Sequence, residues 1–404
     1  MPERKSESGE RKAQNIWVSS LNAPARERFR RDRPVRFYDT TLRDGEQTVG
    51  VVLSPQQKLE IARLLDQLGV SRIEAGFPRV SPDDAEAMRL IAAAGLKAEI
   101  WGFARAVRAD VDEVLKLGLR ATVIETPTSE IKLKAYGIAP DDGVRRACDA
   151  VRHAAGEGVT VAFFAVDGTR TDLDFLKRIY LETLSAGAKE IVVVDTIAAC
   201  GPEAIEDLVA QVCSWVGDVP VHFHGHNDFG MATACAIAAV RAGAQWIQGT
   251  INGMGERAGN ADIAEIALAL KAIYDLPIQM NLERVREVSR AVAHAAGYSL
   301  DAWKPLVGEN LFTRESGAVA SQFHIPEAIE PYSADIVGSP RTVVLGKKSG
   351  LDNIDIKARE LNLDLPPDKR PAVLAAVKQL GIEKRGLLSD DEFRQIIADI
   401  TALR

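Results

Sequence analysis

The segment VRFYDTTLRDGEQ, Val35 to Gln47, joins a strand-like run to a cluster of charged residues around a glycine. Val, Phe and Tyr favour a β-strand, whereas Arg, Asp and Gly do not. The charges of Arg43, Asp44 and Glu46 therefore belong to a loop at the carboxyl end of the first strand. In α/β proteins this is the place where ligands bind.

The same pattern repeats along the chain after Val35. Short apolar runs alternate with segments whose apolar residues recur three and four positions apart, as in amphipathic helices. The expected strands are VRFYDT, RIEAG, AEIWGF, ATVIE, VTVAFFAV, EIVVVDT, VPVHFHG and QWIQGTI. This number of strand–helix units in about 240 residues is typical of an α/β fold of the (β/α)8 TIM-barrel type. We expect the barrel over residues 34–278, a polar N-terminal arm over 1–33 and a mostly helical C-terminal appendage over 279–404.

Composition narrows the class of protein further. The net charge of −7 argues against a general nucleic-acid-binding surface. No apolar run reaches the roughly 18–20 residues of a membrane span. The four cysteines show no Cys-x-x-Cys spacing and suit a reducing compartment. We therefore expect a cytoplasmic protein that acts on small molecules.

The segment VHFHGHND contains two histidines that predict a metal site. In a strand, His224 and His226 share one face and can both point into the mouth of the barrel. Imidazoles at this spacing are a good pair of ligands for a divalent ion such as Mg²⁺, Mn²⁺ or Zn²⁺. His222 has the same parity but lies deeper, where a packed histidine is expected rather than a ligand. The alternative for His224 and His226 is a pair of hydrogen-bonded polar residues in a turn.

Two further segments supply candidate ligands. Asp44, after the first strand, is a natural carboxylate third ligand, because closure of a barrel brings the first and seventh strands near one another. In NGMGERAGN, after the eighth strand, Asn260 offers an amide oxygen as a fourth ligand. Gly253, Gly255 and Gly259 would allow the backbone to approach closely there.

The segments DTTLRDGEQ, HGHNDFGMA and NGMGERAGNA resemble three signatures of the metal-dependent acyl-CoA condensing enzymes. This family includes homocitrate, 2-isopropylmalate and citramalate synthases, with hydroxymethylglutaryl-CoA lyase as a more distant relative. The similarity covers about residues 35–350, and LRDGEQT and GERAGNA most resemble the homocitrate synthases of nitrogen fixers.

The resemblance implies roles for individual residues. Asp44, His224, His226 and Asn260 would be the metal ligands, and Arg43 would steady the 2-oxo group and the developing alkoxide. Gln47 and Thr196 resemble positions that hold the carboxylate of the 2-oxo acid. Simpler alternatives are a surface salt bridge for Arg43 and a turn-capping hydroxyl for Thr196. The family also implies a homodimer in which the appendage reaches over the neighbouring barrel.

Three positions depart from the family pattern at its acid–base groups. Lys132 stands where the family usually has a histidine, Val166 where it has a glutamate, and Val319 where it has a histidine. Tyr332 matches a tyrosine of the family's appendage and is the better candidate for a substitute catalytic group. His324 is a weaker candidate, because a packed histidine explains it as well. Lys132 predicts a substrate-binding charge, although a lysine in solvent remains an alternative.

These observations favour an acyltransferase that forms a carbon–carbon bond between an acyl-CoA, in the first instance acetyl-CoA, and a 2-oxo acid. A metal-dependent aldolase or lyase that cleaves such a bond is the second hypothesis. A non-catalytic metal-binding barrel is the third, and Arg43 argues against it, since a purely structural metal site does not need a guanidinium.

Overall fold

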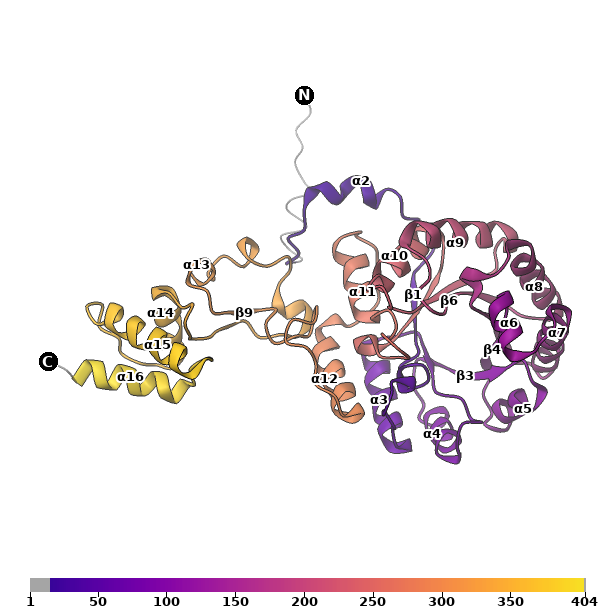
Figure 1. The fold of residues 1–404 in the computed structure, drawn as a ribbon, viewed down its shortest axis with the longest axis horizontal. Coiled ribbons are helices and arrows are strands. Elements are labelled where there is room, and N and C mark those ends of the chain that lie inside the picture. Colours follow the sequence, from indigo (N-terminus) through magenta and orange to yellow (C-terminus); the bar gives the residue numbers. More distant parts are fainter. Residues whose placement is uncertain (1–14, 403–404) are drawn as a thin grey trace, which may run out of the picture. The chain divides into compact units, whose positions relative to one another are not determined.

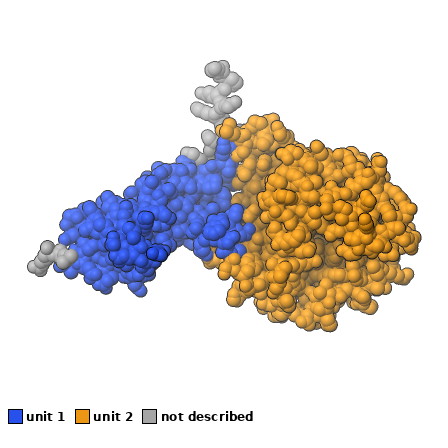
Figure 2. Space-filling model, in the orientation of Figure 1, with its two compact units in different colours: residues 1–19, 300–404 blue, residues 20–299 orange. Residues whose placement is uncertain are grey.

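The computed structural model describes residues 15–402 and divides the chain into two compact units. One unit comprises residues 20–299, and the other comprises residues 300–404 with the N-terminal segment up to residue 19 (Figure 2). Each unit is described by itself. Much of the expected polar arm, residues 1–14, lies outside the described residues.

The larger unit is a closed parallel barrel, which confirms the predicted TIM-barrel fold (Figure 1). Its strands pair in chain order, and β8 closes the barrel against β1. All the expected strand segments form. The strands are β1 (Arg36–Asp39), β2 (Arg72–Glu74), β3 (Glu99–Arg105), β4 (Ala121–Pro127), β5 (Thr160–Val166), β6 (Glu190–Asp195), β7 (Val221–Gly225) and β8 (Trp246–Gly249).

Helices surround the barrel and begin and end at local sequence signals. In the first helix after β1, Ser54 accepts a hydrogen bond from the backbone of Gln57, and Gly69 ends the helix in a left-handed conformation with φ 92°. The helices of this unit are α2 (Ala23–Arg26), α3 (Pro55–Leu68), α4 (Pro82–Ala92), α5 (Arg108–Lys116), α6 (Glu130–Tyr136), α7 (Pro140–Gly156), α8 (Leu173–Ala186), α9 (Pro202–Val216), α10 (Ala232–Ala242), α11 (Ile263–Ala272) and α12 (Val285–Ala296).

Alternation along each strand decides which side chains fill the barrel interior. Tyr38, Trp101, Val123, Phe164 and Val192 belong to one buried cluster inside the barrel. Residues two positions further along the same strands therefore point inward at the mouth, one layer higher. This parity places polar side chains of several strands around a common space.

Helix α12 packs against the helices and loops of the barrel and belongs to the same compact unit. Gln57 of α3 donates a hydrogen bond to the carbonyl of Ala295, and Asn252 donates one to the carbonyl of Ser289. The compact unit that holds the barrel thus extends to residue 299. The domain boundaries expected near residues 33 and 278 stay a prediction.

The smaller unit has its own apolar core, built by three helices: α14 (Leu351–Glu360), α15 (Arg370–Lys384) and α16 (Asp390–Ala402). Ser389 and Glu392 form the reciprocal cap of α16, in which each side chain accepts a hydrogen bond from the backbone amide of the other residue. The rest of the unit holds the parallel pair β9 (Thr313–Arg314) and β10 (Thr342–Val343) and the short helix α13 (Gly317–Ala320).

Within the described residues, no helix is long and apolar enough to cross a membrane. All four cysteines are free.

Candidate metal centre and active site

Three buried side chains, one from the loop after β1 and two from the end of β7, meet at the mouth of the barrel. Nε2 of His224 lies 3.4 Å from Nε2 of His226, and these atoms lie 3.5 and 3.8 Å from Oδ2 of Asp44. One ligand atom from each of the three residues falls within 4.8 Å of the others. The geometry expected from strand parity and barrel closure is present.

Asn260 joins the cluster from the loop after β8. Its Nδ2 donates hydrogen bonds to Oδ1 of Asp44 at 2.9 Å and to the carbonyl of Met254 at 3.0 Å. Its Oδ1 is buried and has no hydrogen-bond partner among the described residues. A buried acceptor without a partner is costly, and an amide oxygen beside a carboxylate and two imidazoles suits a divalent cation.

Two glycines make this arrangement of the loop sterically feasible. A Cβ on Gly255 would lie 2.2 Å from Nδ2 of Asn260 and 3.1 Å from Oδ1 of Asp44. A Cβ on Gly259 would lie 1.9 Å from the carbonyl oxygen of Gly253. Both glycines also have positive φ, 150° and 81°, so the close approach predicted for this loop depends on the lack of side chains.

The ionisation states of the cluster match those that metal ligands need. Burial opposes ionisation of Asp44, but Arg43 and the two histidines outweigh it and hold the pKa of this carboxyl well below its usual value. Burial, only partly offset by Asp44, lowers the pKa of His226 to about 4. A carboxylate and a neutral imidazole are therefore available at neutral pH.

A chain of hydrogen bonds behind His224 sets which of its nitrogens carries the proton. Nδ1 of His224 lies 3.1 Å from Oε1 of Gln248, and Nε2 of Gln248 lies 3.3 Å from Nδ1 of His222. Nε2 of His222 lies 2.6 Å from Glu190, which also accepts two hydrogen bonds from Arg72. Because the Glu190 carboxylate only accepts, Nε2 of His222 must carry the proton. In a neutral His222, Nδ1 is then the acceptor for the Gln248 amide.

The Gln248 oxygen then faces Nδ1–H of His224, which leaves the Nε2 lone pair of His224 free at the metal centre. His222 itself lies one layer deeper and stacks on Trp246, with ring centroids 5.7 Å apart. Both its ring nitrogens are occupied by Glu190 and Gln248, so it belongs to the support of the cluster.

Arg43 lies beside the cluster and is almost fully buried, with 8% of its side chain exposed. It pairs with Glu74 through Nε and with Asp44 through Nη1 at 2.8 Å. Its guanidinium stacks over Phe103, 4.3 Å from the ring centroid. Nη2 is buried without a hydrogen-bond partner among the described residues. One donor of a fixed guanidinium therefore remains for a ligand.

The three other residues expected to bind substrate, besides Arg43, occupy loops and a helix that follow β1, β6 and β4. Gln47 is exposed in the short 3-10 turn Gly45–Gln47. Thr196 follows β6, and its hydroxyl oxygen accepts a hydrogen bond from the backbone of Asp167 at 2.8 Å. Lys132 is half-buried in the first turn of α6, where its backbone amide donates a hydrogen bond to the hydroxyl of the N-cap residue Ser129. Their roles stay predictions.

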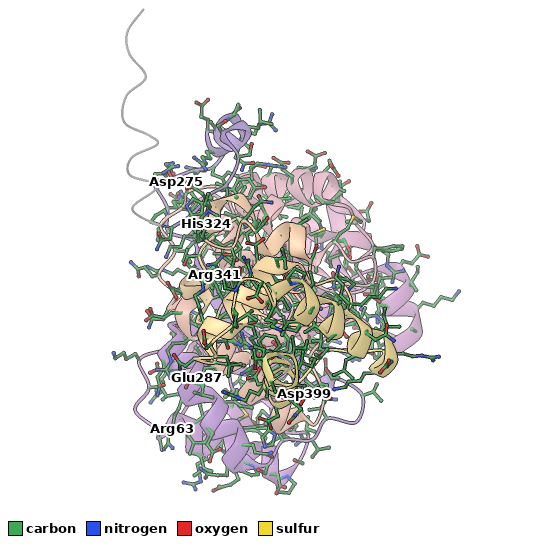
Figure 3. All side chains as sticks on the ribbon, turned by 90° about the vertical axis from the view of Figure 1, so that its left-hand side faces the viewer. Arg63, Asp275, Glu287, His324, Arg341 and Asp399 are labelled. Atoms are coloured by element: carbon green, nitrogen blue, oxygen red, sulfur yellow. The ribbon has the colours of Figure 1, made fainter. Side chains whose placement is uncertain are left out.

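Three residues weighed as acid–base groups or their replacements lie in the smaller unit. Tyr332 is half-buried, bridges to the backbone of Ile16 and packs edge-on against Phe312. His324 is exposed (labelled in Figure 3), and Val319 lies in α13. The structure describes these side chains within that unit only.

Sequence patterns did not single out several polar side chains of the barrel interior. Glu74 accepts hydrogen bonds from Tyr38 at 2.8 Å and from Arg43, and Gln248 orients His224. Glu125, near the end of β4, has a pKa raised to about 7, because burial outweighs the attraction of Arg43 and Arg105. Each of these polar residues occupies an inward position of its strand, and for Glu125 and Gln248 the preceding inward positions, Val123 and Trp246, are apolar. That contrast is a signal that the sequence contains.

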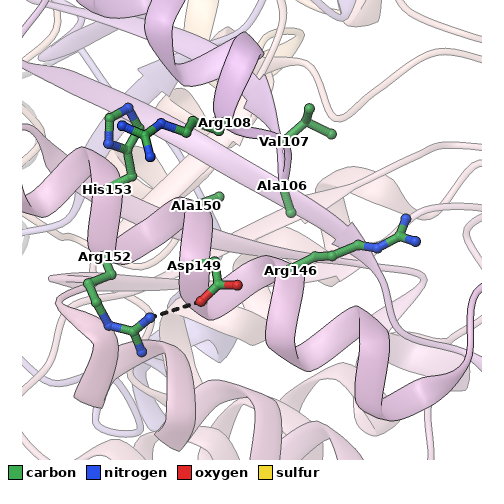
Figure 4. Close-up of a pocket in the computed structure, with 8 residues that line it drawn as sticks. All are labelled: Ala106, Val107, Arg108, Arg146, Asp149, Ala150, Arg152 and His153. Carbon is green, nitrogen blue, oxygen red and sulfur yellow. Dashed lines mark hydrogen bonds and ion pairs between the residues drawn. The ribbon is translucent and has the colours of Figure 1, made fainter.

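A separate cavity of about 690 Å³ lies along α5 and α7, outside the barrel (Figure 4). No candidate metal ligand lines it. Arg152 is paired there with Asp149 at 2.9 Å, and His153 is paired with Asp112 at 2.6 Å. The charged side chains around this cavity are therefore largely paired with one another on the helix surface. The cavity is lined by Ala106, Val107, Arg108, Arg146, Asp149, Ala150, Arg152 and His153.

Fold and site together define a class: a TIM barrel with a carboxylate, two imidazoles and an amide oxygen gathered at the carboxyl ends of its strands. Residues 34–292 match the family model HMGL-like, and the chain belongs to this family.

Known proteins resemble it over most of its length. Homocitrate synthase AksA of Methanopyrus kandleri is 42% identical over 372 residues, which cover 92% of this chain and 93% of that protein. The 2-isopropylmalate synthase 2 of Caldanaerobacter subterraneus is 38% identical over 377 residues, which cover 92% of this chain and 97% of that protein. Among solved structures, an HMG-CoA lyase of Bacillus subtilis has a TM-score of 0.60 at 18% identity, covering 67% of this chain and 96% of that one. At that identity the likeness concerns the fold.

Proposed function

We propose that the protein is a metal-dependent acyltransferase that condenses an acyl-CoA, in the first instance acetyl-CoA, with a 2-oxo acid and then hydrolyses the thioester. The observation that carries the proposal is the placement of Arg43 against the Asp44, His224 and His226 cluster, with a free guanidinium donor in the same buried space. The names of the relatives, homocitrate synthase and 2-isopropylmalate synthase, support it.

In this proposal Asp44, His224, His226 and Asn260 hold one divalent ion. When bound, such an ion supplies Lewis-acid polarisation of a carbonyl. Nη2 of Arg43 donates to the oxygen on which negative charge develops as the carbon–carbon bond forms. Because Arg43 is fixed by Glu74, Asp44 and the ring of Phe103, little reorganisation is needed at the moment of reaction.

The remaining predicted residues position the 2-oxo acid or move protons. The hydroxyl of Thr196 accepts from the backbone of Asp167, so its proton is free to be donated to a substrate carboxylate. We assign Gln47 to the same carboxylate and Lys132 to the far end of the substrate. Tyr332 is assigned to proton transfer.

The test is a screen for release of free CoA thiol from acetyl-CoA in the presence of single 2-oxo acids, with Mg²⁺, Mn²⁺ or Zn²⁺ added. Thiol release that requires both a 2-oxo acid and a metal is the expected result. Acetyl-CoA without a 2-oxo acid controls for simple hydrolysis. Cleavage of a 3-hydroxy acyl compound without thiol release would favour a lyase, and no turnover of any kind would favour a non-catalytic metal-binding barrel.

We also propose that the protein works in the cytoplasm as a homodimer. Large apolar side chains are exposed on the loops after β1 and β7, where Val49, Val52 and Phe229 are 93%, 84% and 73% exposed. Contact with a second copy would remove such surface from water. Sedimentation that shows only monomer at micromolar concentration would contradict the proposal.

A further inference from the structure

One acidic side chain inside the barrel differs from all the others in its surroundings. Carboxyl groups occupy the inward positions of strands at Glu74, Glu99, Glu125 and Glu190. Glu74 is bound by Tyr38 and Arg43, and Glu99 and Glu190 are both bound by Arg72. Glu125 makes no side-chain hydrogen bond or ion pair with a described residue. Unlike the other three, its carboxyl group has no hydrogen-bonding or ionic partner in the described part of the chain that would account for its inward position.

The strand register places Glu125 at the height of the active site. Val123, two residues earlier, belongs to the buried cluster of the barrel interior, so Glu125 points inward one layer above it. Glu125 pairs in register with Arg105 of β3 on one side and with Phe164 of β5 on the other. The ring centroid of Phe164 lies 5.1 Å from that of His224. The guanidinium of Arg43 lies 6.0 Å from the same Phe164 ring centroid. Phe164 thus links Glu125 to the metal cluster.

The neighbouring arginines do not neutralise Glu125 directly. Arg105 is held by two hydrogen bonds to Asp110, at 2.7 and 3.1 Å. Arg43 is held by Glu74 and Asp44. The strand beside Glu125 offers only an apolar side chain at the next inward position, Val166, which pairs in register with Pro127. Glu125 is therefore the free carboxyl group on this wall of the mouth.

We propose that Glu125 is the base that removes a proton from the methyl group of acetyl-CoA, an inference that rests on the proposed function. In this step the C–H bond breaks, the proton goes to the Glu125 carboxylate, and the electron pair forms the bond to the carbonyl carbon of the 2-oxo acid. The carbonyl π pair moves to oxygen, beside Arg43, and that oxygen takes up a proton. Water then cleaves the thioester and the thiol leaves as free CoA.

The protonation behaviour of Glu125 agrees with this role. Burial raises its pKa to about 7, while Arg43 and Arg105 pull it down and Glu74 and Asp44 push it up. A base works best when its pKa lies near the working pH. A bound divalent ion adds positive charge nearby and would move this pKa lower, which keeps the group ionised in the loaded enzyme.

The experiment measures proton removal separately from condensation. Acetyl-CoA is incubated in deuterium oxide with the Mg²⁺-loaded enzyme and oxamate, an inert 2-oxo acid analogue, and deuterium in the methyl group is followed by mass spectrometry. We expect the Glu125→Gln variant to lose this exchange by about 10²–10⁴-fold, with metal content and oxamate affinity unchanged. The exposed Glu130→Gln is the matched control and should exchange like the wild type.

A pair of further variants keeps the inference testable if Glu125→Gln loses its metal. Glu125→Asp retains the charge but withdraws it by one methylene, and we expect at least a tenfold slower exchange with metal content unchanged. In the double variant Glu125→Gln/Val166→Glu the carboxyl moves to the adjacent strand, and exchange should recover at least tenfold over the single variant. Wild-type exchange in Glu125→Gln or Glu125→Asp would overturn the inference.

Failure of the inference and failure of the proposed function give different results. A wild-type enzyme that neither exchanges the methyl protons nor releases thiol with any 2-oxo acid contradicts the proposed function itself. A wild type that does both, together with a Glu125→Gln variant that does both equally well, contradicts the assignment of Glu125 alone.

Discussion

Nδ1 of His224 lies 3.1 Å from Oε1 of Gln248, on the side of the imidazole opposite the Asp44 carboxylate. The contact fixes the tautomer of His224, because an amide oxygen accepts only from a protonated nitrogen. The orientation of Gln248 is in turn fixed by His222 and Glu190. Glu190, His222 and Gln248, deeper in the barrel, therefore orient the metal-binding nitrogen of His224 at the mouth.

Replacing Gln248 by leucine should weaken metal binding by about 10–100-fold, the usual effect of losing a hydrogen bond behind a ligating histidine. Isothermal titration with Mn²⁺ or Zn²⁺ measures this change. Gln211→Leu, at an exposed position of α9, serves as the control and should bind normally. Equal affinity in Gln248→Leu and the wild type would show that Gln248 does not orient His224.

Replacing His224 by alanine should remove the bound divalent ion and all metal-dependent turnover. The variant keeps one imidazole, one carboxylate and the amide oxygen of Asn260, and the loss of one of two imidazoles leaves too weak a ligand set for tight binding. Elemental analysis of the purified variant reports the metal content directly. His294→Ala, at an exposed position of α12, should keep its metal. Full activity and unchanged metal content in His224→Ala would rule out the proposed centre.

Replacing Arg72 by methionine should destabilise the fold by about 3–5 kcal/mol, because it leaves the buried Glu190 carboxylate without its arginine partner. Arg72 is 9% exposed, binds Glu190 at 2.6 Å and lies 3.6 Å from the ring centroid of Trp246. Urea unfolding measures the difference. Arg89→Met, which breaks an exposed pair with Glu86, should change stability far less, because water screens that pair. Similar losses in both variants would contradict the argument from burial.

The same network predicts how stability depends on pH. Burial alone would raise the pKa of Glu190, but His222 and Arg72 outweigh it and lower the pKa from 4.5 to about 2. The unfolded chain therefore binds this proton first, so the stabilisation is complete above pH 4.5 and is lost as the pH falls toward 2. Urea unfolding at pH 5 and pH 3 should show the loss, and the Glu190→Gln variant should show a smaller pH dependence. An equal dependence in both proteins would assign it to other groups.

The sequence predicts the barrel and the metal cluster for related physical reasons. The short apolar runs of EIVVVDT and VPVHFHG mark buried strands, and closure in chain order puts the ends of β1, β8 and β7 side by side. Asp44, His224, His226 and Asn260 therefore had to converge if the fold was correct.

The roles of Gln248, Glu74 and Glu125 depend on the stagger between strands, which no local pattern encodes. Glu125 lies beside Arg105 and Phe164 only because of the register of β3, β4 and β5. Glu74 meets Arg43 because the short strand β2 ends level with the loop that follows β1. The sequence shows that these residues are polar and lie in strands, but only the structure shows which of them are already paired.

Lys132 provides a test of substrate choice. Its side chain is half-buried in the first turn of α6, just after β4, and its amine makes no hydrogen bond or ion pair with a described residue. A lysine offers a fixed positive charge, and the apolar Val166 lies at the end of the adjacent strand. We therefore expect a 2-oxo acid that carries a second anionic group, or an apolar portion, away from the metal.

Replacing Lys132 by alanine should raise KM for that substrate by about 10–100-fold, the value of a hydrogen bond to a charged group. The kcat should change much less, because the contact is the same in the ground state and in the transition state. Steady-state kinetics with the acid identified by thiol release measures both constants. Lys134→Ala, on an exposed position of the same helix, is the matched control. A collapse of kcat at unchanged KM would instead place Lys132 in proton transfer, and no change in either constant would return it to the solvated surface.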